Sequence, residues 1–158
     1  RVKWCKEWQS VDPMKICHSD ESTYKVGFDS NNYWITRAPH EEMLERNLRP
    51  TFRSGRKYVS VWVCFCGREL GLIVILEKGL KMTAQEYIDT ILKPHFVPFW
   101  RRMQRKYGTQ NSPVYMQQDN HSVYTAGIVK KYLAQEKVRL LPWPPTSLDL
   151  APIKNLWI

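Results

Sequence analysis

The feature that most restricts the possible folds of this chain is a pair of β-rich runs separated by four residues. Residues 58–65 and 70–76 are rich in Val, Tyr, Phe, Trp, Ile and Leu, and β-branched and aromatic residues favour strands. The connection Cys66-Gly67-Arg68-Glu69 is short enough to predict a β-hairpin. We expect these two strands to form the centre of a sheet.

A helix is predicted after the hairpin. The residues Thr83-Ala84-Gln85-Glu86 have the pattern of a capping box, in which Thr and Glu satisfy the first free N–H groups of a helix. Pro94 and Pro98 predict a kink or a break within it. Apolar residues follow the capping box at helical spacing: Tyr87, Ile88, Ile91, Leu92, Phe96, Phe99, Trp100 and Met103.

Further strands and a helix surround these elements. Residues 15–19 are predicted to form a short strand that ends at Asp20, and residues 23–28 and 33–36 are candidates for the next strands. Residues 112–118 predict a strand that runs into Asp119, and residues 138–141 predict another. The alternation of strands and helices indicates a layered α/β domain. Between the last two strands, residues 122–136 predict one helix with five buried residues: Val123, Ile128, Val129, Tyr132 and Leu133.

The composition indicates one globular domain over residues 1–158 and favours a polyanionic partner. The chain is 43% hydrophobic, and 24 Lys and Arg against 15 Asp and Glu give a formal charge of +9, which favours nucleic acid. No apolar run approaches the roughly 20 residues of a membrane span, and the first residues lack the apolar segment of a signal peptide. We therefore expect a soluble, intracellular protein without a membrane partner.

The four cysteines are too few for a disulfide framework. Cys64 and Cys66 would lie on the same face of one strand, and no second ligand pair stands nearby in the sequence. Buried cysteine as a small hydrophobic residue is the alternative to zinc.

Two groups of basic residues are candidates for contact with a phosphate backbone. One lies in residues 27–57, which predict an extended loop rich in Pro, Arg and Glu. It contains Arg46, Arg49, Arg53, Arg56 and Lys57. The other lies at the end of the predicted long helix, where a solvated helix face is the alternative to DNA binding, and it contains Arg101, Arg102, Arg105 and Lys106.

Three segments of the chain resemble the active-site motifs of one family. They are His18-Ser19-Asp20-Glu21-Ser22, Tyr115-Met116-Gln117-Gln118-Asp119-Asn120, and the run from Trp143-Pro144-Pro145 to Lys154-Asn155-Leu156-Trp157. In order and spacing they resemble the catalytic domain of a DDE transposase of the mariner superfamily, in the branch whose third acid is Glu. The resemblance covers nearly the whole chain. The third acid of the family pattern falls on Lys154.

This resemblance implies an RNase H-like fold with a central mixed β-sheet flanked by helices. It also implies DNA cleavage and strand transfer for transposition and integration, with two Mg²⁺ or Mn²⁺ ions as cofactors and transposon ends and target DNA as partners. Asp20 and Asp119 would be catalytic metal ligands, and Lys154 would occupy the place of the family's Glu. A nuclear location follows from a DNA partner, and relatives suggest a homodimer held through the 27–57 loop.

The chain departs from the family in ways that affect these expectations. Lysine cannot ligate Mg²⁺, so activity is expected to be weak or lost, unless the Lys154 side chain swings into solvent or Asp149 or Glu21 supplies an oxygen. The family His falls on Tyr124, and His121 is a possible substitute. The helix-turn-helix modules that precede this domain in the family, and the helix that follows it, are not in the sequence, which suggests a fragment or a decayed copy.

Two alternatives therefore stand beside an active transposase. Asp20 and Asp119 would be turn or capping residues if they held no metal, since Asp is common between a strand and a helix. The domain would then be a catalytically inactive module, kept for DNA binding or protein interaction through its basic residues. An engineered change at Lys154 is less consistent with the altered second motif than natural decay is.

Overall fold

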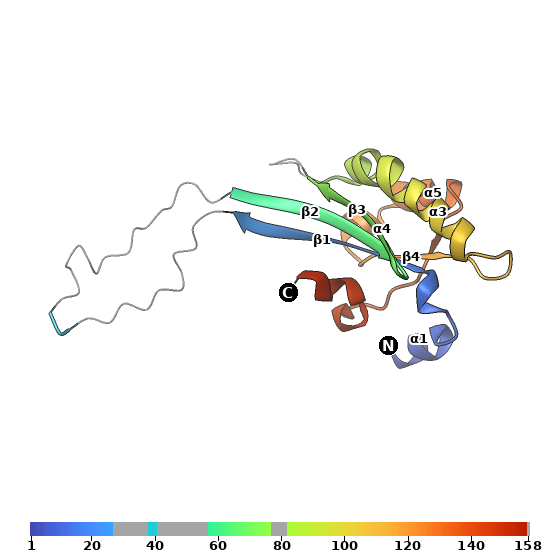
Figure 1. The fold of residues 1–158 in the computed structure, drawn as a ribbon, viewed down its shortest axis with the longest axis horizontal. Coiled ribbons are helices and arrows are strands. Elements are labelled where there is room, and N and C mark those ends of the chain that lie inside the picture. Colours follow the sequence, from blue (N-terminus) through green and yellow to red (C-terminus); the bar gives the residue numbers. More distant parts are fainter. Residues whose placement is uncertain (27–37, 41–56, 77–81, 158) are drawn as a thin grey trace.

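The computed structural model describes residues 1–26, 38–40, 57–76 and 82–157. A five-stranded mixed sheet forms its centre (Figure 1). The strands are β1 (Ile16–Val26), β2 (Lys57–Cys66), β3 (Glu69–Ile75), β4 (Tyr115–Gln117) and β5 (Arg139–Leu140). Their order across the sheet is β3-β2-β1-β4-β5. β1 pairs antiparallel with β2, β2 pairs antiparallel with β3, and β1–β4 and β4–β5 are parallel.

The predicted hairpin is confirmed as β2 and β3, but its place at the centre of the sheet is wrong. β3 is an edge strand, and β1 is the central strand. The turn uses Gly67 at φ 58°, a backbone conformation that glycine adopts most easily. The register shifts between Val63 and Phe65, where a Cβ on Gly71 would lie 2.7 Å from the carbonyl oxygen of Cys64. Glycine is therefore required at this irregularity.

The first strand is longer than the sequence predicted. β1 does not end at Asp20, because its pairing with β2 continues without interruption from Cys17 opposite Cys66 to Val26 opposite Lys57. Polar residues with modest strand propensity lie in the middle of this strand, and the ladder to β2 overrides their local preference. The prediction of a separate strand over 23–28 is thus wrong for residues 23–26. Residues 27–28 and the candidate strand 33–36 lie outside the described residues.

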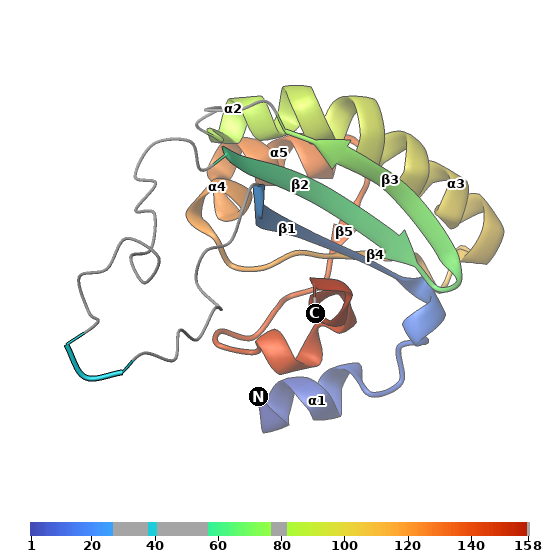
Figure 2. The same ribbon diagram turned by 60° about the vertical axis from the view of Figure 1, so that its left-hand side comes forward.

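Helices cover one face of the sheet (Figure 2). α2 (Ala84–Tyr87), the π-helix η4 (Ile88–Phe96) and α3 (Val97–Tyr107) follow one another directly, and α4 (Ser122–Thr125) and α5 (Gly127–Gln135) lie beside them. Both hydrogen bonds of the predicted capping box between Thr83 and Glu86 are present. Pro94 lies inside η4, and Pro98 lies in the first turn of α3, where a missing N–H group is tolerated. The prolines therefore change the helix type without ending the helix.

The predicted helix over 122–136 is two helices. The chain breaks at Ala126, which has the extended ψ angle of 144°. This break changes the helical phase, so Ile128 is 48% exposed although it was predicted to be buried. Val129 and Leu133 are buried as predicted.

The hydrophobic core lies between the sheet and these helices. Cys17, Trp62 and Cys64 project from the strands into the same cluster as Phe96 and Met103. The rings of Trp62 and Phe96 pack edge to face with centroids 6.2 Å apart. Burial raises the pKa of Cys64 to about 12, so Cys64 is a protonated core residue at neutral pH.

The other face of the sheet carries α1 (Val2–Trp8) and the C-terminal segment, which includes the 3₁₀-helices η5 (Leu148–Leu150) and η6 (Pro152–Trp157) (Figure 1). The short helix η1 (Pro13–Lys15) leads into β1. None of the helices in the described part of the chain has the length and the apolar composition needed to cross a membrane.

Candidate active site

Asp20 lies on the sheet face opposite the helices. Side chains alternate along a strand, and Cys17 belongs to the helix-covered core, so His18 and Asp20 project to the other side. Asp20 is opposite Val63 of β2, and only 6% of its surface is exposed. A carboxylate this buried requires charged or hydrogen-bonding partners.

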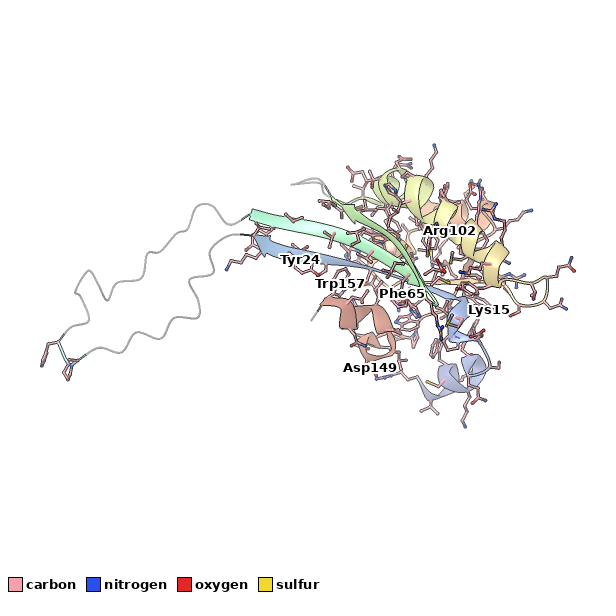
Figure 3. All side chains as sticks on the ribbon, viewed as in Figure 1. Lys15, Tyr24, Phe65, Arg102, Asp149 and Trp157 are labelled. Atoms are coloured by element: carbon pink, nitrogen blue, oxygen red, sulfur yellow. The ribbon has the colours of Figure 1, made fainter. Side chains whose placement is uncertain are left out.

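Both carboxylate oxygens of Asp20 have a partner from η6. Lys154 Nζ donates to Oδ1 at 2.6 Å, and Trp157 Nε1 donates to Oδ2 at 2.6 Å. A 3₁₀-helix has three residues per turn, so Lys154 and Trp157 lie on the same side of η6. The Trp157 ring also packs edge to face on Tyr24 of β1, with centroids 6.0 Å apart (Figure 3). Asp20 is therefore held by one cation and one neutral donor.

Asp119 follows the strand next to β1. β1 and β4 are parallel with Ile16 opposite Tyr115 and His18 opposite Gln117, and neighbouring strands lie about 4.8 Å apart. Continuing this register by two residues places Asp119 beside Asp20. Asp119 Oδ1 accepts the backbone N–H of His121 at 3.0 Å.

Asp119 is not the helix cap that the sequence offered as an alternative. The N-cap of α4 is His121, whose Nδ1 accepts the Val123 N–H at 3.4 Å. The bond from His121 N–H to Asp119 forms a turn before the helix, and a carboxylate in such a turn still has oxygens that accept other donors. This role of His121 is structural, and the side chain is exposed.

Glu21 and Asp149 are the acids that could replace the missing ligand, and both are bound elsewhere. Glu21 is adjacent to Asp20 in β1 and so projects to the opposite face, where it accepts the Tyr124 hydroxyl at 3.0 Å. Burial and the neighbouring Glu21 carboxylate raise the pKa of Tyr124, which therefore remains a hydrogen-bond donor. Asp149 is ion-paired with Arg1.

Fit to a divalent metal can be judged from these contacts. Mg²⁺ prefers several oxygen ligands, commonly carboxylates, but both oxygens of Asp20 accept a hydrogen bond, one of them from an ammonium group. Among the described residues, no three His, Cys, Asp or Glu side chains are grouped so that they could hold a metal ion. The site as built does not fit the two-metal arrangement that the resemblance implies.

The basic residues fall into two groups with different outcomes. Arg46, Arg49, Arg53 and Arg56, like the predicted dimer loop, lie outside the described residues, and of Lys57 only the backbone at the start of β2 is described. On α3, Arg101 pairs with Glu136, and Arg102 lies 5.3 Å from the Phe99 ring centroid (Figure 3). Arg105 is exposed on the same helix.

Sequence reasoning missed two features of the site. The contact of Trp157 with Asp20 had no signal in the sequence beyond the three-residue spacing from Lys154. His18 Nδ1 and Gln117 Oε1 form a buried pair at 3.1 Å that links β1 and β4 below the two aspartates. Burial lowers the pKa of His18, so its ring is neutral.

The fold and the site together define a class of protein. A mixed sheet with two aspartates on neighbouring parallel strands and helices on one face is an RNase H-like arrangement. Comparison with solved structures agrees. The Mos1 transposase catalytic domain with raltegravir and Mn superimposes with a TM-score of 0.62 at 17% identity, covering 96% of this chain and 60% of that one. A Mos1 paired-end complex with the left transposon end gives a TM-score of 0.61 at 20% identity, covering 96% of this chain and 42% of that one.

Sequence relatives give the family. The Tcb1 transposase of Caenorhabditis briggsae is 31% identical over 161 residues, covering 99% of this chain and 55% of the relative. The Tc1 transposase of Caenorhabditis elegans is 29% identical with the same coverage, and the Tc3 transposase of that species is 28% identical over 99% of this chain and 44% of the relative. No family model matches the chain.

The chain is a homologue of the Tc1/mariner transposases and has the RNase H-like fold of the Mos1 catalytic domain. It spans about half the length of the relatives it matches. The predicted fold class and the family resemblance are therefore confirmed.

Proposed function

We propose that this chain is a DDE-type transposase catalytic domain, descended from enzymes that cleave DNA and transfer its strands, in which Lys154 impairs catalysis. One observation carries the proposal: Lys154 Nζ lies 2.6 Å from Oδ1 of Asp20, where the family has its third acid. The relatives' printed activity is transposition, and several of the Mos1 structures are complexes with transposon ends or were solved with Mn or Mg. We extend DNA as partner and a divalent cation as family cofactor to this chain on that basis.

The charge of Lys154 opposes a cation at Asp20. Two unit charges 4 Å apart interact by about 4 kcal/mol at an effective dielectric of 20, and a dication doubles this repulsion. The side chain of Lys154 is 30% exposed, so solvent screens part of the effect. A metal that displaced the ammonium would also have to break the hydrogen bond from Trp157 or share that oxygen.

A second candidate function is a non-enzymatic DNA-binding module with Asp20 and Asp119 as relics. The internal neutralisation of Asp20 favours it, because the domain can then be stable without metal. The formal charge of +9 supplies the attraction to DNA. A nuclear location and a homodimer through residues 27–57 belong to this proposal as much as to the first.

Calorimetric titration with Mn²⁺ tests the proposal directly. Three proteins should be compared: the wild type, Lys154→Glu, and Lys154→Gln as the matched control that removes the charge without adding a carboxylate. We expect binding by Lys154→Glu and no measurable heat from the wild type. Mn²⁺ binding by the wild type with an affinity equal to that of Lys154→Glu would overturn the role given to Lys154.

DNA experiments separate the two candidate functions. Salt-dependent binding of duplex DNA by the wild type, without added metal and without nicking, favours the non-enzymatic module. Nicking by Lys154→Glu but not by Lys154→Gln supports an impaired catalytic domain with an intact scaffold. Metal-stimulated nicking by the wild type would exclude the relic interpretation.

A further inference from the structure

A cavity of about 570 Å³ lies at the end of the sheet away from the aspartates. Pro113, just before β4, and Val138, just before β5, form part of its wall, whereas Asp119 follows the opposite end of β4. The C-terminal part of α3 contributes Trp100 and Gln104. This volume is in the range of about 300–1,000 Å³ that is typical of small-molecule sites.

The cavity is lined by cations and no acid. Lys137 and Arg139 belong to its wall, and the remaining lining residues are neutral. The nearest acid in sequence is Glu136, whose carboxylate is bound to Arg101. Neither Lys137 nor Arg139 has an ion pair with any described residue. The positive charge of this wall is therefore not neutralised within the described part of the domain.

Lys137 occupies a backbone position that normally favours glycine. The end of α5 is closed by two bonds, from Val138 N–H to Leu133 O at 2.9 Å and from Lys137 N–H to Ala134 O at 3.0 Å. This pair is the Schellman motif, and its left-handed residue is usually Gly. Here that residue is Lys137 at φ 61°. A lysine kept in a disfavoured conformation at a cavity wall indicates a functional constraint.

We propose that this cavity binds a phosphate group. Lys137 supplies a point charge, and Arg139 supplies a planar guanidinium that matches two phosphate oxygens. Because Val138 between them is buried, the two cations flank one inward residue. Thr109, Gln104 and Gln110 add a hydroxyl and two amides to the lining, which are donors suited to the remaining oxygens.

The phosphate has two possible sources, a free nucleotide or the backbone of DNA. Exposed Arg105 on α3 extends the positive charge near the cavity and would suit a longer polyanion. Neither source requires Asp20 or a metal, so the proposal stands apart from the catalytic state of the domain.

The test is a binding titration of the whole chain, without divalent metal, followed by backbone NMR shifts. The probes are inorganic phosphate, deoxyadenosine monophosphate and a short DNA duplex. The variants are Lys137→Gly and Arg139→Gln, with Lys131→Gln on the exposed face of α5 as the control for net charge. Lys137→Gly is informative because glycine suits the backbone there, so we expect a higher melting temperature together with weaker binding.

We expect shifts centred on residues 137–139 and about a fivefold loss of affinity in each cavity variant, against less than twofold in the control. Losses with both phosphate and the mononucleotide identify a small-molecule site, and a loss with the duplex alone identifies a DNA backbone site. The proposal is overturned if no probe shifts residues 137–139. It is also overturned if Lys131→Gln weakens binding as much as Lys137→Gly does, because the effect is then one of net charge. Metal binding and nicking do not enter this experiment, so its failure leaves the proposed function untouched.

Discussion

Lys154 and Asp20 form an ion pair that joins the C-terminal segment to the central strand of the sheet, with Nζ and Oδ1 2.6 Å apart. The side chain of Asp20 is 5% exposed, and that of Lys154 is 30% exposed. The ammonium thus takes the place of an external cation as the counter-charge of a buried carboxylate. The same contact that opposes metal binding is expected to hold η6 against β1.

The stability of the domain should depend on this pair. Lys154→Met leaves the Asp20 carboxylate buried without a counter-charge, and we expect the free energy of unfolding to fall by about 2 kcal/mol. Adding Asp20→Asn should recover most of the loss, because the unpaired charge is then gone. Urea unfolding of both single variants and the double variant measures the coupling. Additive effects would show that the pair contributes nothing of its own.

Trp157→Phe tests the second donor to Asp20. The substitution keeps an aromatic ring for the contact with Tyr24 but removes the Nε1–H group that donates to Oδ2. We expect a loss of about 1–2 kcal/mol in the free energy of unfolding, as is usual for one hydrogen bond to a charged group. Tyr24→Phe is the control, since it keeps the ring contact and leaves the hydrogen bond intact. An equal loss in both variants would place the effect in ring packing.

Local signals in the sequence predicted the elements whose structure is locally determined. The bonds between Thr83 and Glu86 and the turn at Gly67 depend on residues within a few positions of each other, and both were predicted correctly. The continuation of β1 through Asp20 depends on a ladder to β2, more than 40 positions away in sequence, and local propensity could not reveal it. The break at Ala126 was missed because alanine favours helix, and nothing nearby in the sequence signals a change of phase.

The candidate site shows the same division. Motif order placed Asp20, Asp119 and Lys154 in one region, and the parallel pairing of β1 with β4 provides the physical basis. The direct contact of Lys154 with Asp20, and the role of Trp157 beside it, depend on how η6 packs on the sheet. Such packing is set by tertiary contacts that no spacing in the sequence expresses.

The capping box at the start of α2 gives a prediction about local stability. Thr83→Ala removes the acceptor of the Glu86 N–H, a bond of 3.2 Å, and we expect a loss of about 1 kcal/mol. Thr83→Ser retains the hydroxyl and should lose less than half as much. The midpoint of urea unfolding measures both. If the two variants are equally destabilised, the threonine methyl group, rather than the cap, is responsible.

Thiol reactivity should report the packing of the sheet. Of the four cysteines, Cys5 is exposed, and Cys17, Cys64 and Cys66 are buried. Burial raises the pKa of Cys64 to about 12, so at pH 8 almost none of it is thiolate, which is the reactive form. We expect Ellman's reagent to modify one thiol quickly in the native protein. The fast phase should vanish in Cys5→Ser, and a second fast thiol in that variant would contradict the packing described for the core.

Metal should stabilise the domain only after Lys154 is replaced by an acid. In Lys154→Glu the repulsion of three carboxylates is unrelieved without a cation, so we expect a melting temperature below that of the wild type in a chelator. A ligand that binds the folded state alone stabilises it by about 2.7 kcal/mol at a concentration 100 times its dissociation constant. Mn²⁺ should therefore raise the melting temperature of Lys154→Glu by several degrees and leave the wild type unchanged. Lys154→Gln controls for the loss of the ion pair: it should be destabilised in chelator and gain little from Mn²⁺. An equal rise in the glutamate and glutamine variants would mean that Asp20 and Asp119 suffice to bind the metal and that position 154 acts only by removing its positive charge.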